Sequence, residues 1–176
     1  YGQNTVFNWF GVKNIKLENI SSWNAQSWSI VFITSENVYL NNFIVNDSIP
    51  QKVQDGVDFL GYAKNITLTN GRINNGDDKI VFCPNSTGGI AGAYNHTAYT
   101  GVDGDQTNIK VDNILFDTYG KGFAFYDAGG NMIKDVFISN ISGNSQSFWL
   151  GMFNADILGS YTLTTGTKIP HNIHFE

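Results

Sequence analysis

The sequence has little charge, and its positive charges are not clustered. Charged residues make up 14% of its 176 residues, the formal net charge is −5, and no run of lysine and arginine occurs. Nucleic acids and anionic membranes both require a basic face on the protein that binds them. The composition therefore argues against nucleic acid and membrane as partners, and it favours a neutral or weakly charged ligand.

Cysteine and long apolar runs are also scarce. Cys83 is the only cysteine, which excludes a disulfide within the chain and a cysteine-based metal cluster. No apolar stretch approaches the length of about 20 residues that a membrane-spanning helix needs. His96, His171 and His174 are not spaced with the acidic residues as metal ligands, and no nucleotide-binding loop or nucleophilic triad is present. We expect a monomer with neither metal nor cofactor.

A repeat runs along the chain. Asn, a β-branched residue, any residue, an apolar residue, any residue and Asn follow one another from Asn14, Asn37, Asn65 and Asn108, and from Asp135 with Asp in first place. The steps between copies are 23, 28, 43 and 27 residues. A step of about 22 residues is the length of one solenoid coil, and 43 is close to two such steps. Apolar and polar residues alternate within each copy, which indicates strands with one buried face.

This repeat predicts an all-β, right-handed parallel β-helix as a single domain over residues 1–176. Asparagine tolerates left-handed backbone in turns, and its side chain can hydrogen-bond to the asparagine of the next coil, so we expect an asparagine ladder along the axis. A leucine-rich horseshoe lacks its leucine signature here, and a β-sandwich would not repeat at one coil's spacing. Neither Tyr1 nor Glu176 lies in an obvious capping helix, so we expect the domain to be incomplete at both ends.

Two acidic segments lie one coil apart. The first contains Asp55 and Asp58, and the second contains Asp77 and Asp78. Neighbouring coils are about 4.8 Å apart along the axis, so Asp55, Asp77 and Asp78 should converge on one face. Crowding raises the pKa of at least one carboxyl, as a general acid requires, and an ionised neighbour can orient water, as in glycoside hydrolysis. Solvated turn residues and a calcium site are the alternatives.

These motifs resemble glycoside hydrolase family 28, the polygalacturonase family, and in particular its secreted fungal exo-acting branch. The resemblance runs from about Phe7 to the end of the chain. It is most specific from Asp55 to Asp58 (Asp-Gly-Val-Asp) and from Asn74 to Thr87, which includes Gly-Asp-Asp. The segment that starts at Trp28 also resembles the family's tryptophan-containing coil before the site.

The resemblance implies hydrolysis of an α-linked polysaccharide of pectin or polygalacturonan type with inversion at the anomeric carbon. Asp77 would protonate the leaving oxygen, and Asp55 and Asp78 would activate water. The typical carboxyl separation of inverting pairs, about 6.5–9.5 Å, exceeds the rise of one coil, so the side chains would have to splay.

One family motif is missing. No Gly-His-Gly follows one coil after Gly-Asp-Asp, and the interval from Asn85 to Asn108 is about ten residues short of the family pattern. His96 lies in this interval in a different context, and we interpret it as a surface histidine.

The family's Arg-Ile-Lys is also replaced. Ala124 and Tyr126 stand in place of the two cations, and Lys121 is the nearby positive charge. Without an arginine clamp a uronate would lose its charge-assisted anchor. Phe123, Phe125 and Tyr126 could instead offer apolar faces to a neutral sugar ring, or they could fill an ordinary coil.

We predict substrate binding by Asp58, Lys79, Lys121 and Tyr126. A catalytically degenerate, carbohydrate-binding β-helix is the alternative to a hydrolase, and a polysaccharide lyase is a third possibility with Lys79 as its candidate base. Retention of all three mutually repelling carboxylates favours the hydrolase.

Six N-glycosylation sequons occur where chance would give about three, which favours a secreted, extracellular glycoprotein. They begin at Asn19, Asn46, Asn65, Asn85, Asn95 and Asn140.

Overall fold

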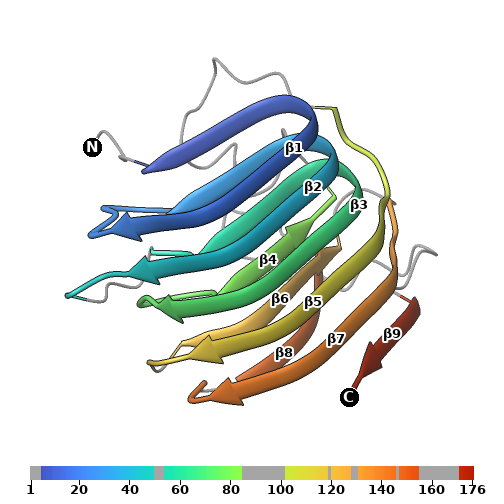
Figure 1. The fold of residues 1–176 in the computed structure, drawn as a ribbon. Helices are drawn as coiled ribbons and strands as arrows, with labels where there is room; N and C mark the ends of the chain where they lie inside the picture. Colours follow the sequence, from blue (N-terminus) through green and yellow to red (C-terminus); the bar gives the residue numbers. More distant parts are fainter. Residues whose placement is uncertain are drawn as a thin grey trace.

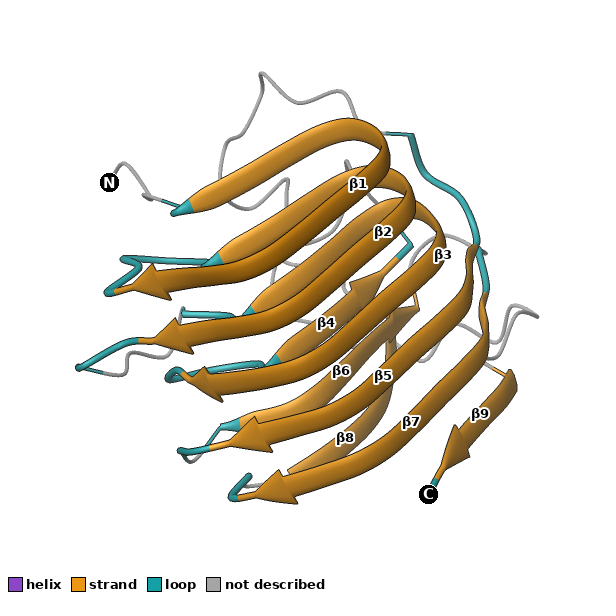
Figure 2. Ribbon diagram, viewed as in Figure 1, coloured by secondary structure: helices purple, strands orange, loops and turns teal. Residues whose placement is uncertain are grey.

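The computed structural model describes residues 5–49, 54–84, 102–118, 120–127, 131–145, 147–154 and 171–176. Strands are the only regular structure in these segments (Figures 1 and 2). They are β1 (Phe7–Trp23), β2 (Ile30–Asn46), β3 (Val57–Asn74), β4 (Ile80–Cys83), β5 (Gln106–Phe116), β6 (Lys121–Asp127), β7 (Ile133–Gly143), β8 (Ser147–Asn154) and β9 (His171–Phe175).

The strands stack in parallel, and their register follows the sequence repeat. Equivalent positions of successive copies are direct partners: Ile15 with Val38, Val38 with Ile66, Ile66 with Ile109 and Ile109 with Val136. Each long strand bends, so that one coil presents two sheet faces, as Figure 1 shows for β1, β2 and β3. The predicted parallel β-helix is confirmed.

The 43-residue step between Asn65 and Asn108 is one coil, and the prediction that it spans two is wrong. The first part of β3 pairs with β4 and the second part with β5, and the Asn108 amide donates directly to the Asn65 carboxamide oxygen at 2.7 Å. The coil is long because β4 ends at Cys83 and β5 begins only at Gln106. A long connection within one coil, and not a second coil, takes up the extra residues.

The asparagine ladder is confirmed. Asn14, Asn37, Asn65 and Asn108 all have a positive φ, between 55 and 58°, which asparagine adopts more easily than most residues. From Asn37 onward, each amide in this series donates to the carboxamide oxygen of the preceding asparagine at 2.7 Å. The strands therefore bend at the same place in every coil. A second ladder includes bonds from Asn42 to Asn19 and from Asn113 to Asn70.

The coil interior is filled by residues of the same kind in each layer. Rings of Trp9, Phe32, Phe59, Phe82 and Phe125 stack along the axis with centroids 5.0, 5.0, 5.7 and 5.4 Å apart. Each such pair contributes about 0.5–1.5 kcal/mol beyond the burial of its apolar surface. The stack therefore fixes the register of the strand segments that lead to the acidic residues.

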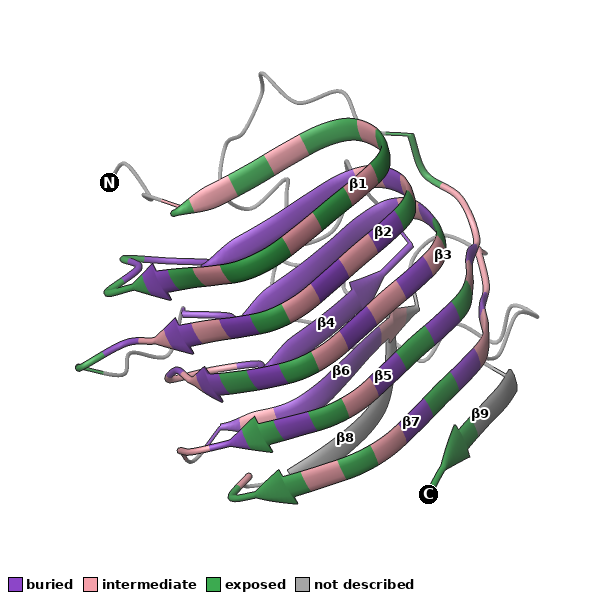
Figure 3. Ribbon diagram, in the orientation of Figure 1, coloured by how far each residue is buried: buried purple, intermediate pink, exposed green. Residues whose placement is uncertain are grey.

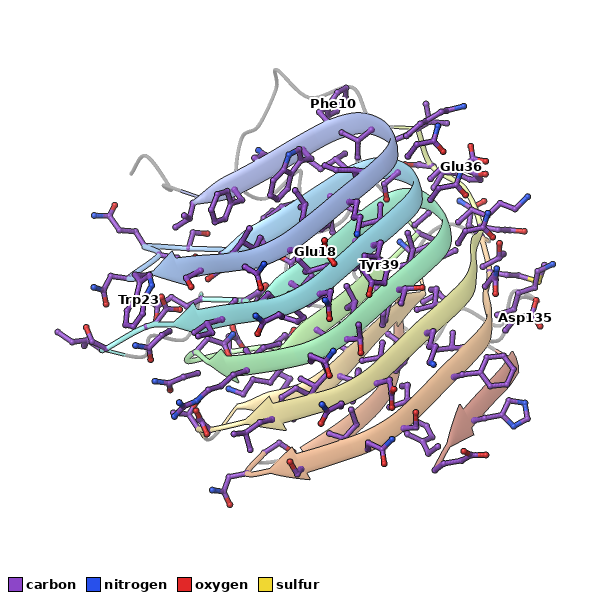
Figure 4. The ribbon with its side chains drawn as sticks, viewed as in Figure 1. Phe10, Glu18, Trp23, Glu36, Tyr39 and Asp135 are labelled. Atoms are coloured by element: carbon purple, nitrogen blue, oxygen red, sulfur yellow. The ribbon has the colours of Figure 1, made fainter. Side chains whose placement is uncertain are left out.

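The two sheet faces differ in burial. Along β5 and β7 buried and exposed residues alternate, whereas the early part of β2 and β3 and the whole of β4 are buried throughout (Figure 3). Glu18 and Tyr39 lie on the solvent side of β1 and β2 (Figure 4). A strand buried on both faces reads as a continuous apolar run, as β4 does. None of the described residues forms a helix able to cross a membrane.

Two substitutions of Asn37 distinguish the contribution of the ladder hydrogen bonds to stability from that of the left-handed backbone conformation. Asn37→Gly loses the bonds to Asn14 and from Asn65 but accepts a φ of 55°, and we expect it to lower the free energy of unfolding by about 1 kcal/mol. Asn37→Ala also strains the backbone, so it should cost about 1 kcal/mol more than Asn37→Gly. Chemical denaturation measures both.

Asn8→Ala is the control, because Asn8 is exposed on β1 and lies outside the ladder. It should change the free energy of unfolding by less than about 0.5 kcal/mol. Equal losses for the Gly and Ala variants of Asn37 would contradict a left-handed requirement at this corner.

Candidate active site

The acidic residues lie where β3 begins and where the chain turns from β3 into β4. Asp55 lies just before β3, and Asp77 and Asp78 lie one coil later, between β3 and β4. The backbone ties the two segments together: Gly56 N–H donates to Asp78 C=O at 2.8 Å, and Asp77 N–H donates to Gln54 C=O at 3.1 Å. The spacing of 22 residues thus places the carboxyls on neighbouring coils, as the sequence predicts.

Glycines let the backbone segments approach each other here. A Cβ added at Gly56 would lie within 3.0 Å of the Lys79 carbonyl oxygen and of Ile73 Cγ2. A Cβ added at Gly120 would lie within 3.0 Å of the Asp77 carbonyl oxygen and of Lys79 Nζ. Both positions therefore require glycine for close packing, and both pack against the turn that carries the acids.

The three predicted catalytic carboxylates converge. One oxygen from each of Asp55, Asp77 and Asp78 can be chosen so that all three lie within 4.8 Å of one another. The Asp77 side chain is 28% exposed, the Asp78 side chain is 3% exposed, and Asp55 is buried. Asp77 is thus the member of this trio that solvent and a ligand reach most easily.

Strand β6 supplies two polar groups to the same cluster. Lys121 Nζ lies 3.3 Å from Asp77 Oδ1 and 3.0 Å from Asp78 Oδ1. The Tyr126 hydroxyl donates a hydrogen bond of 2.7 Å to Asp78 Oδ2. The structure therefore brings both residues to the acids, and Lys121 supplies a positive charge between two of them.

Burial and mutual repulsion raise the pKa of two of the acids. Desolvation and then the charges of Asp78 and Asp77 raise the pKa of Asp55 well above its ordinary value. Desolvation and then Asp78 also raise the pKa of Asp77, although Lys121 opposes them. An acid with a raised pKa and an exposed oxygen is suited to give up a proton to a ligand.

The two β6 groups stay protonated for different reasons. Burial lowers the pKa of Lys121, but the charges of Asp78 and Asp77 outweigh burial and raise this pKa above the ordinary value. Burial and then the charge of Asp78 raise the pKa of Tyr126 far above that of a free phenol. Tyr126 is therefore a hydrogen-bond donor over the whole working range of an enzyme.

The trio is also a possible cation site by distance, because clustered carboxylate oxygens suit a hard ion. The Lys121 ammonium already lies against Asp77 and Asp78 and provides their counter-charge. A cation there would have to displace this ammonium, so the donor set fits an ion pair better than a metal.

Lys79 lies inside the protein. Its ammonium is fully buried and donates to Asn75 C=O at 2.8 Å, to Asn75 Oδ1 at 2.7 Å and to Thr118 Oγ1 at 3.0 Å. Burial lowers the pKa of Lys79 to about 8. All three ammonium hydrogens are used inside the protein, so the structure places Lys79 in the wall that holds the Gly-Asp-Asp turn and not on a surface open to substrate.

Asp58 is buried as well. It lies on β3 between Val31 of β2 and Val81 of β4, and neither of its carboxyl oxygens has a hydrogen-bond partner among the described residues. Burial and then the charge of Asp55 raise its pKa well above the ordinary value. The predicted contact of Asp58 with substrate would require a path through this apolar surrounding.

The aromatic residues of β6 divide between two faces. Phe123 and Phe125 are buried in the coil interior, where Phe125 stacks on Phe82, so they fill an ordinary coil. Tyr126 lies against the second, outward cluster that contains Trp28. Of these three rings, the Tyr126 ring alone lies outside the coil interior.

Sequence reasoning missed the polar network under the turn. Asn75 donates to Asp78 C=O at 2.8 Å and to Gln54 C=O at 2.5 Å, and Thr118 donates to Asn75 C=O at 2.7 Å. The position of Asn75, directly before Gly-Asp-Asp, is a signal that could have identified it. Nothing local marks Thr118, which lies 39 residues beyond Lys79 and meets it only through coil stacking.

Four predicted glycosylation sites lie in the described residues. Asn19 and Asn140 are exposed, whereas Asn46 and Asn65 are partly buried, and the Asn65 amide donates to Asn37. The predictions for Asn85, Asn95 and His96 lie outside the described residues.

Comparison with known proteins identifies one family. The model of the family described as glycosyl hydrolases family 28 matches residues 3–119. This stretch includes Asp55, Asp77 and Asp78, and it ends before β6. No solved structure gives a significant match.

Three curated fungal proteins are similar to the chain. The exopolygalacturonase of Cochliobolus carbonum is 37% identical over 150 residues, which cover 81% of this chain and 29% of that protein. The probable exopolygalacturonase B of Aspergillus oryzae is 36% identical over 137 residues, 73% of this chain and 27% of that protein. The putative galacturan 1,4-alpha-galacturonidase A of Aspergillus flavus is 28% identical over 143 residues, 75% of this chain and 28% of that protein. The chain thus spans less than a third of the length of these relatives.

The buried Asp58 predicts a pH dependence of stability. Its folded-state pKa is raised above the unfolded value, so its stabilising contribution is complete below about pH 4 and is lost as pH rises through the folded pKa. We expect the free energy of unfolding of the wild type to fall more steeply above pH 4 than that of Asp58→Asn, by up to about 1.4 kcal/mol per pH unit. Denaturation at a series of pH values measures the two slopes.

Asp112→Asn is the control of opposite sign. Hydrogen bonds from Asn140 and Ser139 lower the pKa of Asp112, so its contribution is lost as pH falls and not as pH rises. Parallel stability curves for wild type and Asp58→Asn would contradict a raised pKa at Asp58.

Proposed function

Because the chain belongs to glycosyl hydrolases family 28, we propose that it is part of a glycoside hydrolase that cleaves an α-linked polysaccharide of pectin or polygalacturonan type. The observation that carries the proposal is the partly exposed Asp77 beside two more deeply buried carboxyls, with one oxygen of each within 4.8 Å. The names of the relatives, two of them exopolygalacturonases, support a galacturonate polymer.

In the proposed reaction Asp77 is the general acid. Its raised pKa favours the protonated carboxyl, and this proton passes to the glycosidic oxygen as the bond to the anomeric carbon breaks. A water molecule attacks the anomeric carbon and loses its proton to Asp78 or Asp55. Asp78 is the better placed base, because Tyr126 and Lys121 hold both of its oxygens.

The charge of the sugar at the cleavage site is a separate part of the proposal. Arg72, the only arginine of the chain, forms an ion pair with Asp117, and Lys121 is paired with the catalytic acids. The residues that this structure describes near the acids therefore offer no unpaired cation to a uronate carboxylate. This favours a neutral residue, or an anion that shares Lys121, at the cleaved position.

A catalytically silent, carbohydrate-binding role is the second candidate. Lys121 pairs with both Asp77 and Asp78, and such a pair withholds the acid from a substrate unless binding rearranges it. The raised pKa of Asp77 argues against full capture of its charge by Lys121.

We also propose that the protein is secreted and carries N-linked glycans. The number of sequons supports this, and the exposed side chains of Asn19 and Asn140 are the most accessible of the described acceptors.

Replacement of Asp77 by Asn tests the general acid. We expect the variant of the full-length protein to release reducing sugar about 10²–10⁴ times more slowly than the wild type, because an amide cannot donate the proton. Substrate binding should persist. The assay compares a panel of pectic and neutral α-glycans.

Asp112→Asn, on the outer face of β5, is the matched control and should retain full activity. Unchanged hydrolysis by Asp77→Asn would overturn the assignment of the acid. Binding without hydrolysis by the wild type, on every glycan, would favour the silent role.

The stereochemistry of the first product tests the mechanism. The family resemblance implies inversion, for which carboxyl groups are typically about 6.5–9.5 Å apart, and retention uses about 5–5.5 Å. Single oxygens of the three carboxyls lie within 4.8 Å of one another, so inversion requires Asp77 to turn away from the base to admit water. We expect proton NMR of early product to show a β-anomer from an α-linkage, and an initial α-anomer would instead indicate a covalent intermediate.

A further inference from the structure

The two ends of one strand hold the two oxygens of one carboxylate. Lys121 begins β6, and its ammonium lies 3.0 Å from Asp78 Oδ1. Tyr126, near the end of β6, donates its hydroxyl to Asp78 Oδ2 at 2.7 Å. Two residues of the following coil therefore hold the Asp78 carboxylate.

The backbone of Asp78 is fixed at the same time. Its N–H donates to Asp55 Oδ1 at 3.1 Å, and its C=O accepts from Gly56 N–H at 2.8 Å and from the Asn75 amide at 2.8 Å. The side chain is only 3% exposed. A carboxylate with its backbone and both oxygens held has little freedom to change orientation.

The ring of Tyr126 is positioned by packing. It lies against the outward apolar cluster, which includes Trp28, Leu60, Cys83 and Ala124. These side chains set the direction of the phenol, so its hydroxyl meets Asp78 without an entropic cost at the moment of reaction.

We propose that Tyr126 is a positioning residue, whose hydroxyl holds Asp78 in the orientation in which this carboxylate takes the proton of the nucleophilic water. The proposal rests on the proposed hydrolase function. It assigns Tyr126 to the catalytic carboxylate and not to the sugar, because a phenol has one hydrogen to donate and Asp78 already receives it.

The two possible roles of Tyr126 predict different kinetics. A hydroxyl that binds substrate alone contributes equally to the ground state and the transition state, so its removal raises KM and leaves kcat unchanged. A hydroxyl that orients the base lowers kcat when it is removed. Its loss also leaves Asp78 Oδ2 buried without its hydrogen-bond donor, so the carboxylate is held less firmly in one orientation.

Tyr126→Phe in the full-length protein removes the hydroxyl and keeps the packed ring. We expect kcat to fall about 10- to 100-fold, which corresponds to one hydrogen bond to a charged group, while KM changes less than about twofold. A raised KM with unchanged kcat would overturn the proposal.

Tyr39→Phe is the matched control. It makes the same chemical change on the outer face of β2, where Tyr39 lies on the solvent side (Figure 4), and it should leave kcat and KM as they are. A loss of activity in both variants would indicate a general effect on the fold and would also contradict the proposal.

A second measurement separates this inference from the proposed function. The carboxyl carbon of Asp78 can be followed by NMR in ¹³C-labelled protein and identified by its disappearance in Asp78→Asn. We expect its chemical shift at a fixed pH to differ between Tyr126→Phe and the wild type, because one oxygen of the carboxyl loses its hydrogen-bond donor. If the wild type hydrolyses no glycan but this difference is present, the proposed function fails and the hold on Asp78 stands. Identical chemical shifts would overturn the hold itself.

Discussion

The register between neighbouring coils determines how close the carboxylates come. Each coil repeats the same left-handed corner, and the asparagine at that corner bonds to its equivalent in the coil before it. Because this contact leaves no freedom to slip, residues one coil apart are held at the spacing of adjacent strands. Asp55 and Asp78 are such a pair, so the coil register holds them close together despite the repulsion between their charges.

Residues of three successive coils share the electrostatic cost of bringing these carboxylates together. Burial and repulsion raise the pKa of Asp55 and of Asp77, and Lys121 on β6 offsets part of that repulsion, while Tyr126 on the same strand donates to Asp78. Lys79 stabilises the turn that carries the acids, because its buried ammonium donates hydrogen bonds to Asn75 and Thr118. Breaking such a buried network is far more costly than never having formed it, since the remaining partners stay desolvated. The geometry of the site therefore depends on residues of the following coil as much as on the acidic residues themselves.

Sequence patterns predicted those features that depend on spacing within one coil. The ladder at Asn37 and Asn65 and the pairing of Asp55 with the following coil both follow from a repeat that is visible in the chain. Patterns failed where one coil carries a long connection, because 43 residues look like two coils when only the length is counted. They also gave no indication that Lys79 is buried, because its three acceptors on Asn75 and Thr118 come together only in the folded chain.

The acids differ in accessibility and in hydrogen-bond partners because each contacts different neighbouring residues. Asp77 and Asp78 are adjacent in sequence, yet the Asp78 side chain is 3% exposed and accepts a hydrogen bond from Tyr126, while the Asp77 side chain is 28% exposed. Two chemically identical groups thus acquire different accessibility and different partners from a single step along the chain. Gly56 and Gly120 make that difference possible, because a side chain at either position would push the neighbouring backbone away from the turn. In a solenoid a small residue in one coil can therefore set the chemistry of a residue in the next.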